Sequence, residues 1–231
     1  MEFSEVILKR RSVRRFTQKK IPKEVLMKAF EEAILAPNSS NTQTWRFYWV
    51  NSHEKKENLV AFCLNQSAAR TCSDLIVCVA SPKSWKISQP ELIKYTEEIV
   101  APSAVVNYYK KLVPMMYQWG PLNSWGLLKK ILFTCLGIFK PVPRSPGFRS
   151  EVQEVAIKSS ALACENFVLS LTNQGFASCM MEGFDEARVK KLLKLNCSDR
   201  VVMVIAAGEE AQDGTWGPRF RIKLSQVVHE V

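Results

Sequence analysis

Short apolar runs along the chain predict a small number of strands. Residues 75–80 and 201–207 are continuous apolar segments, which is typical of strands that are buried on both faces. Residues 45–50, rich in aromatic side chains, and residues 177–181 are two further predicted strands. The pattern therefore predicts a few central strands that are widely separated along the chain.

Apolar residues at helical spacing predict that most of the remaining chain is helical. Pro22 suits the first turn of a helix that Pro37 ends, and the longest predicted helix covers about residues 150–173, with Gly175 in the left-handed position after it. Asp185 is a predicted N-cap. Shorter helices are expected near the N-terminus, at 54–64, at 91–99 and at 104–112. Long helices between a few strands indicate an α+β or α/β fold.

Composition indicates a soluble globular protein of one domain, residues 1–231, with an extended helical insert at about 83–150. The 231 residues are 47% hydrophobic and 23% charged, without a linker-like tract or an internal repeat. Seven cysteines without a Cys-x-x-Cys pair indicate reduced thiols, and we expect a cytoplasmic protein. Only two histidines argue against a His-rich metal site, and we expect no bound metal.

A formal net charge of +10 favours anionic partners. Two compact basic clusters occur at residues 9–15 and 219–223, and neither lies in a Gly-rich context, so we do not expect nucleic-acid binding. Dinucleotide-binding, P-loop, zinc-protease and nucleophile-elbow motifs are absent from the sequence. A chain without them can still perform demanding chemistry if a cofactor supplies the reactive atoms.

The basic clusters suit a phosphate. Arg10, Ser12 and Arg14 alternate along a segment that is predicted to be extended, so their side chains face the same way, and Arg219 and Arg221 repeat this spacing. The same residues also fit two solvated basic patches, and residue types alone do not separate these interpretations. Residues 38–43 and 182–185 also allow two interpretations. Both segments suit contacts with a flat polar ring, and both also suit ordinary capped turns.

Taken together, these segments resemble the nitroreductase family of FMN-dependent oxidoreductases. The resemblance rests on residues 10–16 (RRSVRRF), 36–47 (APNSSNTQTWRF), 181–185 (MEGFD) and 218–221 (PRFR), which occur in the family's order. It implies an α+β fold with a central mixed sheet surrounded by helices, in an intertwined homodimer with FMN at the interface. Asn38 and Thr44 depart from the residues that are commoner in the family, and Ala68 and Ala69 stand where some members have a basic residue.

The resemblance also implies roles for individual residues. Arg10, Ser12, Arg14, Arg219 and Arg221 would hold the phosphate and ribityl chain, residues 37–41 would reach the flavin from the partner subunit, and Glu182 and Gly183 would lie near the flavin N5 edge. No proton-transferring catalytic residue is assigned. The candidate FMN-binding residues are Arg10, Arg11, Ser12, Arg14, Pro37, Asn38, Ser39, Ser40, Asn41, Gln43, Asn65, Lys158, Ser159, Met181, Glu182, Gly183, Arg219 and Arg221.

The implied activity is hydride transfer from NAD(P)H through FMN to a small acceptor such as a nitroaromatic or a quinone, in a ping-pong cycle. Two alternatives stay open: a specialised flavin enzyme such as a dehalogenase, and a flavin-binding or membrane-associated protein with little turnover. Residues 127–139, which carry Lys129 and Lys130 among apolar neighbours, suit an interfacial membrane helix. We favour instead a helix that packs over the mouth of the site or at the dimer interface.

Overall fold

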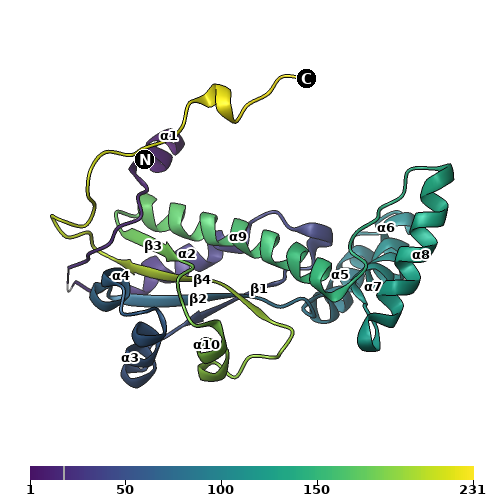
Figure 1. Ribbon diagram of the computed structural model, residues 1–231, viewed down its shortest axis with the longest axis horizontal. Helices are drawn as coiled ribbons and strands as arrows, with labels where there is room; N and C mark the ends of the chain where they lie inside the picture. Colours follow the sequence, from purple (N-terminus) through teal and green to yellow (C-terminus); the bar gives the residue numbers. More distant parts are fainter. Residues whose placement is uncertain (18) are drawn as a thin grey trace.

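The chain folds around a four-stranded antiparallel sheet with the strand order β1-β2-β4-β3 (Figure 1). The computed structural model describes residues 1–17 and 19–231. The strands are β1 (Trp45–Trp49), β2 (Asp74–Ala80), β3 (Ala177–Met181) and β4 (Arg200–Gly208). The two long apolar runs are thus the central strands β2 and β4, as their two-sided burial requires.

Helices cover both faces of the sheet. Successive side chains of a strand point to opposite faces. Ile76 and Cys78 of β2 accordingly pack with α2 (Lys23–Ala33) and α9 (Arg149–Asn173), whereas Leu75 and Val77 pack with α3 (His53–Phe62) and α10 (Glu186–Leu192). Figure 1 shows α9 running along the whole length of the sheet. This helix of 25 residues is the long central element against which the other parts of the fold pack.

The predicted α+β class is confirmed, and the sheet differs from expectation in one respect. All four strands pair antiparallel, although a mixed sheet was expected. In the part of the chain that the structure describes, parallel pairing is limited to an isolated bridge between Ser12 and Ser178. Hydrophobic periodicity locates a strand but carries no information on its direction, which depends on the path of the connections between strands.

The ends of several helices follow from single residues. Gly175 has φ 87° just after α9, and the Asp185 side chain accepts a hydrogen bond from the Arg188 N–H at the start of α10, both as predicted. Helix α2 ends at Ala33, earlier than Pro37. The other helices are α1 (Phe3–Lys9), α4 (Ser67–Thr71), α5 (Trp85–Glu98), α6 (Ser103–Asn107), α7 (Val113–Tyr117) and α8 (Ser124–Phe139), with single turns η1 (Ser39–Asn41), η2 (Tyr108–Leu112), η3 (Pro121–Asn123) and η4 (Leu224–Gln226).

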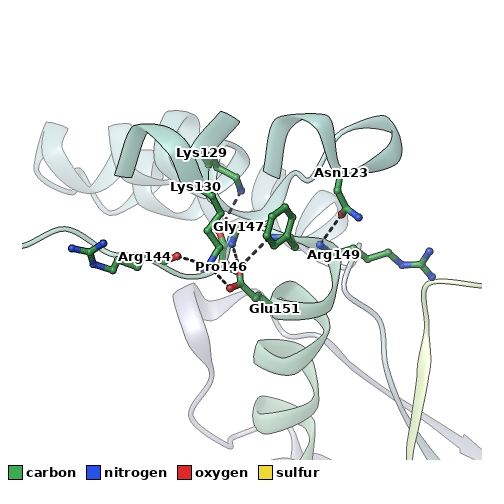
Figure 2. A network of polar contacts seen from close by, with 9 residues as sticks. Asn123, Lys129, Lys130, Arg144, Pro146, Gly147, Arg149 and Glu151 are labelled. Atoms are coloured by element: carbon green, nitrogen blue, oxygen red, sulfur yellow. Dashed lines mark hydrogen bonds and ion pairs between the residues drawn. The ribbon is translucent and has the colours of Figure 1, made fainter. Parts of the chain in front are cut away.

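The insert, α5 to α8, lies beyond one end of the sheet, next to the beginning of α9 (Figure 1). Of two lysines on α8, Lys130 joins the insert to α9, and Lys129 holds α8 to other parts of the insert (Figure 2). Lys129 is 2% exposed, and its Nζ donates to the carbonyl oxygens of Met116, Gln118 and Pro146 at 2.6, 2.8 and 3.3 Å. Lys130 pairs with Glu151 at the first turn of α9, and this carboxylate also accepts from the Gly147 N–H.

Candidate functional site

The first and last segments of the chain meet at a basic cavity of about 240 Å³. The N–H of Val13 donates to the Ser178 carbonyl of β3 at 3.0 Å, which places the N-terminal segment beside the sheet. The Arg14 N–H donates to the Gly214 carbonyl at 2.6 Å, which brings in the C-terminal segment. The cavity is lined by Arg10, Arg11, Ser12, Arg14, Thr215, Trp216, Pro218, Arg219, Phe220 and Arg221. Five guanidinium groups and no carboxylate line it.

The positive charges of these arginines shift the pKa values of neighbouring groups. The pKa of Arg219 is lowered by partial loss of solvent and by the nearby charges of Arg10, Arg221 and Arg11. Burial raises the pKa of the Cys179 thiol on β3, and the positive charges of Arg14 and Arg10 oppose that rise. Like charges held this close favour occupation of the cavity by an anion, which would relieve their repulsion. A phosphate monoester fits this set of donors.

Two of the arginines also act on the scaffold, which the sequence did not predict. The Arg219 guanidinium donates to the carbonyl oxygens of Ile7 at 3.1 Å and Leu8 at 3.0 Å, and to that of Arg10. These carbonyls belong to the C-terminal end of α1, where main-chain acceptors lack helical partners and a cation is favourable. Arg11 donates to the Gly217 carbonyl at 3.0 Å. Both side chains therefore join the two ends of the chain and hold the cavity together.

The other predicted phosphate residues have looser partners. Arg10 Nε lies 3.7 Å from a carboxylate oxygen of Glu165 on α9, and Arg221 donates to the neighbouring Phe220 carbonyl at 2.7 Å. Ser12 is held by its bridge to Ser178. All five residues assigned to the phosphate thus line one cavity, and their binding of a phosphate stays a prediction.

The polar loop that follows α2 is a tight, backbone-strained turn. Ser40, Asn41 and Gln43 have φ angles of 54°, 49° and 47°, which lie in the left-handed region that residues other than glycine rarely adopt. The Asn38 side chain stabilises the turn by accepting from the Gln43 N–H at 2.8 Å. Side-chain acceptance of this kind is a common way for asparagine to close a turn.

Two insert tyrosines hold this loop, and sequence reasoning missed both. The Tyr117 hydroxyl donates to Ser39 Oγ at 2.9 Å, and the hydroxyls of Tyr108 and Ser40 lie 2.5 Å apart. The Ser39 N–H donates to Ser159 Oγ on α9 at 3.4 Å, and the assignment of Ser159 to the flavin site stays a prediction. A cavity of about 200 Å³ separates the loop from the insert and is lined by Ser39, Ser40, Tyr108, Leu112, Val113, Met116, Tyr117, Pro143, Ser145 and Pro146.

The predicted ring-facing turn after β3 lies against the turn after α3. Gln66 Nε2 donates to the Gly183 carbonyl at 2.7 Å, and the Asp185 N–H donates to the Phe62 carbonyl at 2.8 Å. Asn65 has φ 52° in the same turn, so the structure brings it near Gly183. Gln66 therefore contacts the predicted ring-facing turn, and sequence reasoning did not single it out. The polar run at 65–66 was the only available signal for it.

Some predicted residues have other surroundings. Lys158 lies on the exposed face of α9 and pairs with Glu154 at 2.9 Å, because residues four apart on a helix are neighbours. It makes no hydrogen bond or ion pair with the predicted loops within the described residues, and its assignment to the flavin site stays a prediction. Met181 is buried at the end of β3, in the core beneath the turn, whereas Pro37 is exposed.

The two halves of the predicted site are attached to α9 at different levels. Ser39 contacts Ser159, and Arg10 contacts Glu165, which is about 9 Å farther along the helix axis. Among residues 1–17 and 19–231, no hydrogen bond or ion pair joins the 38–43 loop to the arginine-lined cavity. One chain therefore presents two partial sites rather than one closed site.

Comparisons with known proteins give one consistent answer. Residues 7–209 match the profile described as the nitroreductase family. Protein DrgA of a Synechocystis species is 26% identical over 214 residues, which are 92% of this chain and 86% of that protein. A structure from Exiguobacterium sibiricum in complex with FMN superposes with a TM-score of 0.75 at 22% identity, covering 100% of this chain and 98% of that chain.

A second solved structure has the same fold. The NADPH:FMN oxidoreductase from Vibrio harveyi, complexed with NAD+, superposes with a TM-score of 0.65 at 19% identity and covers 99% of this chain and 76% of that chain. The family profile extends from α1 to the end of β4 and so includes the N-terminal arginines, the polar loop and the turn after β3. This chain belongs to the nitroreductase family.

Proposed function

We propose that this protein is an FMN-dependent oxidoreductase that takes hydride from NAD(P)H and reduces a small acceptor such as a nitroaromatic or a quinone. The observation that carries the proposal is the cavity of five arginines without a carboxylate, formed by both ends of a nitroreductase-family chain. The FMN of the Exiguobacterium structure and the nicotinamide of the Vibrio oxidoreductase complex support the choice of cofactor and reductant. When bound, FMN supplies the group that accepts and then donates hydride.

The residues of this chain would bind and orient the cofactor. Arg10, Arg14 and Arg221 have donors free for a phosphate monoester, while Arg219 holds the end of α1 so that Arg10 is correctly placed. The Gly183 N–H makes no hydrogen bond within the described residues and is available as a donor, while the Gln66 amide occupies the space on the side where a side chain would lie. A main-chain donor near the reacting edge stabilises negative charge that develops there.

A second copy of the chain would complete each site. The 38–43 loop and the arginine-lined cavity do not meet within one chain, and the segment that follows the cavity, residues 222–231, extends away from the body with exposed apolar side chains such as Leu224 and Val228 (Figure 1). A homodimer in which each loop reaches the partner's cofactor accounts for both features. All seven cysteines are free in the described structure and five are buried, which supports a cytoplasmic location.

The decisive test is the cofactor content of the purified protein. A yellow protein that releases about one FMN per chain, the stoichiometry expected of a single phosphate cavity, and oxidises NAD(P)H with a nitroaromatic or quinone is the expected result. Replacing Arg219 and Arg221 by Ala should strip the flavin and leave a folded protein, because two cations of the cavity are lost. The matched control is Arg144→Ala with Arg200→Ala, which removes two exposed arginines that do not line the cavity. A colourless protein that takes up no added FMN, or full flavin retention in the Arg219 and Arg221 variant, would refute the proposal.

A further inference from the structure

Helix α8 presents an apolar face to solvent and turns its charges inward. The outward positions are Leu127, Leu128, Ile131, Leu132, Thr134, Cys135, Ile138 and Phe139, all of them exposed and none of them charged. The charged residues of the helix, Lys129 and Lys130, lie on the inner face with the Met116 carbonyl and Glu151 as partners. This arrangement is the reverse of that expected for a surface helix of a soluble protein.

The segment around α8 is basic and lacks acidic residues altogether. Residues 101–148 include six Lys or Arg and no Asp or Glu. Lys140 directly follows the helix, and Arg144 donates to the Gly137 carbonyl at 3.3 Å, so two exposed cations lie beside the end of the apolar face. Neither of them has a carboxylate partner in the part of the chain that the structure describes. An exposed apolar face flanked by unpaired cations is typical of a helix that binds an anionic lipid surface.

We propose that α8 docks this protein on the surface of an anionic lipid bilayer, lying in the plane of the interface. Its apolar face would enter the boundary between headgroups and acyl chains, and Lys140 and Arg144 would remain among the headgroup phosphates. This docking does not depend on the flavin, because the arginine-lined cavity involves other residues at the ends of the chain.

The geometry favours docking over crossing. By length and composition, residues 121–139 are the one helical segment of the described chain that is apolar enough to span a bilayer. The regular part, α8, has 16 residues and is therefore about 24 Å long, shorter than the roughly 30 Å hydrocarbon core. Its inner face is also committed to the protein: Phe133 packs on the core of the insert, and Gly126 is closely approached by the Gly147 carbonyl. Only the outer face is available to lipid.

Charge argues against a second copy of this chain as the occupant. In a two-fold contact of α8 with α8 of a second copy, the exposed Lys140 and Arg144 of each chain would meet the same two cations of the other chain, and residues 101–148 contain no acidic residue to pair with them. Bringing unpaired like charges together is unfavourable, whereas an anionic bilayer supplies the missing counter-charge. The earlier preference for α8 as a cover over the site or the dimer interface is therefore not the one we retain.

Co-sedimentation with vesicles tests the proposal on the full-length protein. Wild type should pellet with vesicles of phosphatidylcholine mixed with phosphatidylglycerol and bind poorly to phosphatidylcholine alone. Ile131→Glu with Ile138→Glu should lower the partition coefficient at least about tenfold. The matched control is Met27→Glu with Ile34→Glu, two exposed apolar residues with the same spacing, one on α2 and one directly after it, and it should pellet as wild type does. Wild type that stays in the supernatant, or an α8 variant that pellets unchanged, would overturn the proposal.

Site-specific labelling gives a second readout and identifies the contact. Cys135, on the outer face of α8, and Cys197 are the two exposed cysteines. An environment-sensitive dye on Cys135 in the Cys197→Ser protein should shift its emission to the blue on addition of anionic vesicles. The same dye on Cys197 in the Cys135→Ser protein should not. If Ile131→Glu with Ile138→Glu instead changes the oligomeric state in light scattering, the face is a protein interface and the lipid proposal fails.

Discussion

The buried ammonium of Lys129 permits a prediction whose size follows from the structure. Burial lowers its pKa to about 8 from an ordinary 10.5, while the negative charge of Glu151 opposes this shift. Relative to the unfolded chain, folding therefore destabilises the charged form of Lys129 by about 3 kcal/mol, although the side chain is still mostly charged at pH 7. Replacement of Lys129 by Met recovers this free energy but leaves buried carbonyls without a donor, at about 1–3 kcal/mol each. Because three carbonyl oxygens lose their donor, this loss is the larger effect, and we expect the Met variant to be less stable than wild type at neutral pH by up to about 6 kcal/mol.

The pH dependence separates the two effects. Because the folded-state pKa lies below the unfolded value, the unfolded chain keeps its proton between about pH 8 and 10.5 when the folded chain has lost it. Stability due to Lys129 therefore rises with pH in this window. From about pH 7 to about pH 9.5, wild type should gain about 2 kcal/mol relative to the Met variant, from the pKa values of 8 and 10.5.

Urea unfolding of both proteins at the two pH values measures this difference. Other groups, such as Cys63, whose pKa burial raises to about 12, titrate alike in the two proteins and cancel. Unfolding can be followed by tryptophan fluorescence, since Trp85 packs in the core of the insert. A gap between wild type and variant that stays constant from neutral to alkaline pH would show that Lys129 is charged throughout, and the reasoning would be wrong.

Three further outcomes are expected. Tyr117→Phe removes the donor to Ser39 Oγ, and should weaken acceptor binding several-fold with little loss of stability, about 1 kcal/mol; an unchanged KM for every acceptor would contradict a role of this contact. Glu151→Gln should abolish the acid-induced loosening of the insert, because the lowered pKa of Glu151 gives stability that is present at neutral pH and lost as pH falls through that value; parallel acid unfolding curves would contradict this. A thiol reagent should react rapidly at Cys135 and Cys197 and slowly elsewhere, and more than two fast thiols in the native protein would refute the burial pattern.

Sequence patterns located those parts of the fold in which one residue type determines the outcome. The central strands were found because both of their faces must be apolar, and Gly175 and Asp185 marked helix ends because few residues suit those backbone positions. Helix α4 was missed because five residues, Ser67–Thr71, do not display a helical period. The antiparallel direction of the strands was not available from periodicity at all.

The candidate site was predicted as a set of segments, and its internal contacts were not. The arginines of both chain ends converge on one cavity, as their spacing and the family resemblance indicated. That Arg219 turns its guanidinium onto the end of α1 depends on where two distant segments meet. The same holds for Tyr108 and Tyr117, which reach the loop of Ser39 across about 70 residues of chain.

Helix α9 has a consequence for how this protein can vary. Glu151 fastens the insert and Ser159 supports the polar loop, and their spacing of eight positions along the helix fixes a separation of about 12 Å. The insert leaves the body after β2 and returns at the first turn of α9, so its length and sequence do not alter this spacing. A different set of helices that retains the attachment to Glu151 would change the surface offered to an acceptor and the tyrosine contacts to the polar loop, while the arginine-lined cavity, which contains no residue of the insert, would stay as it is.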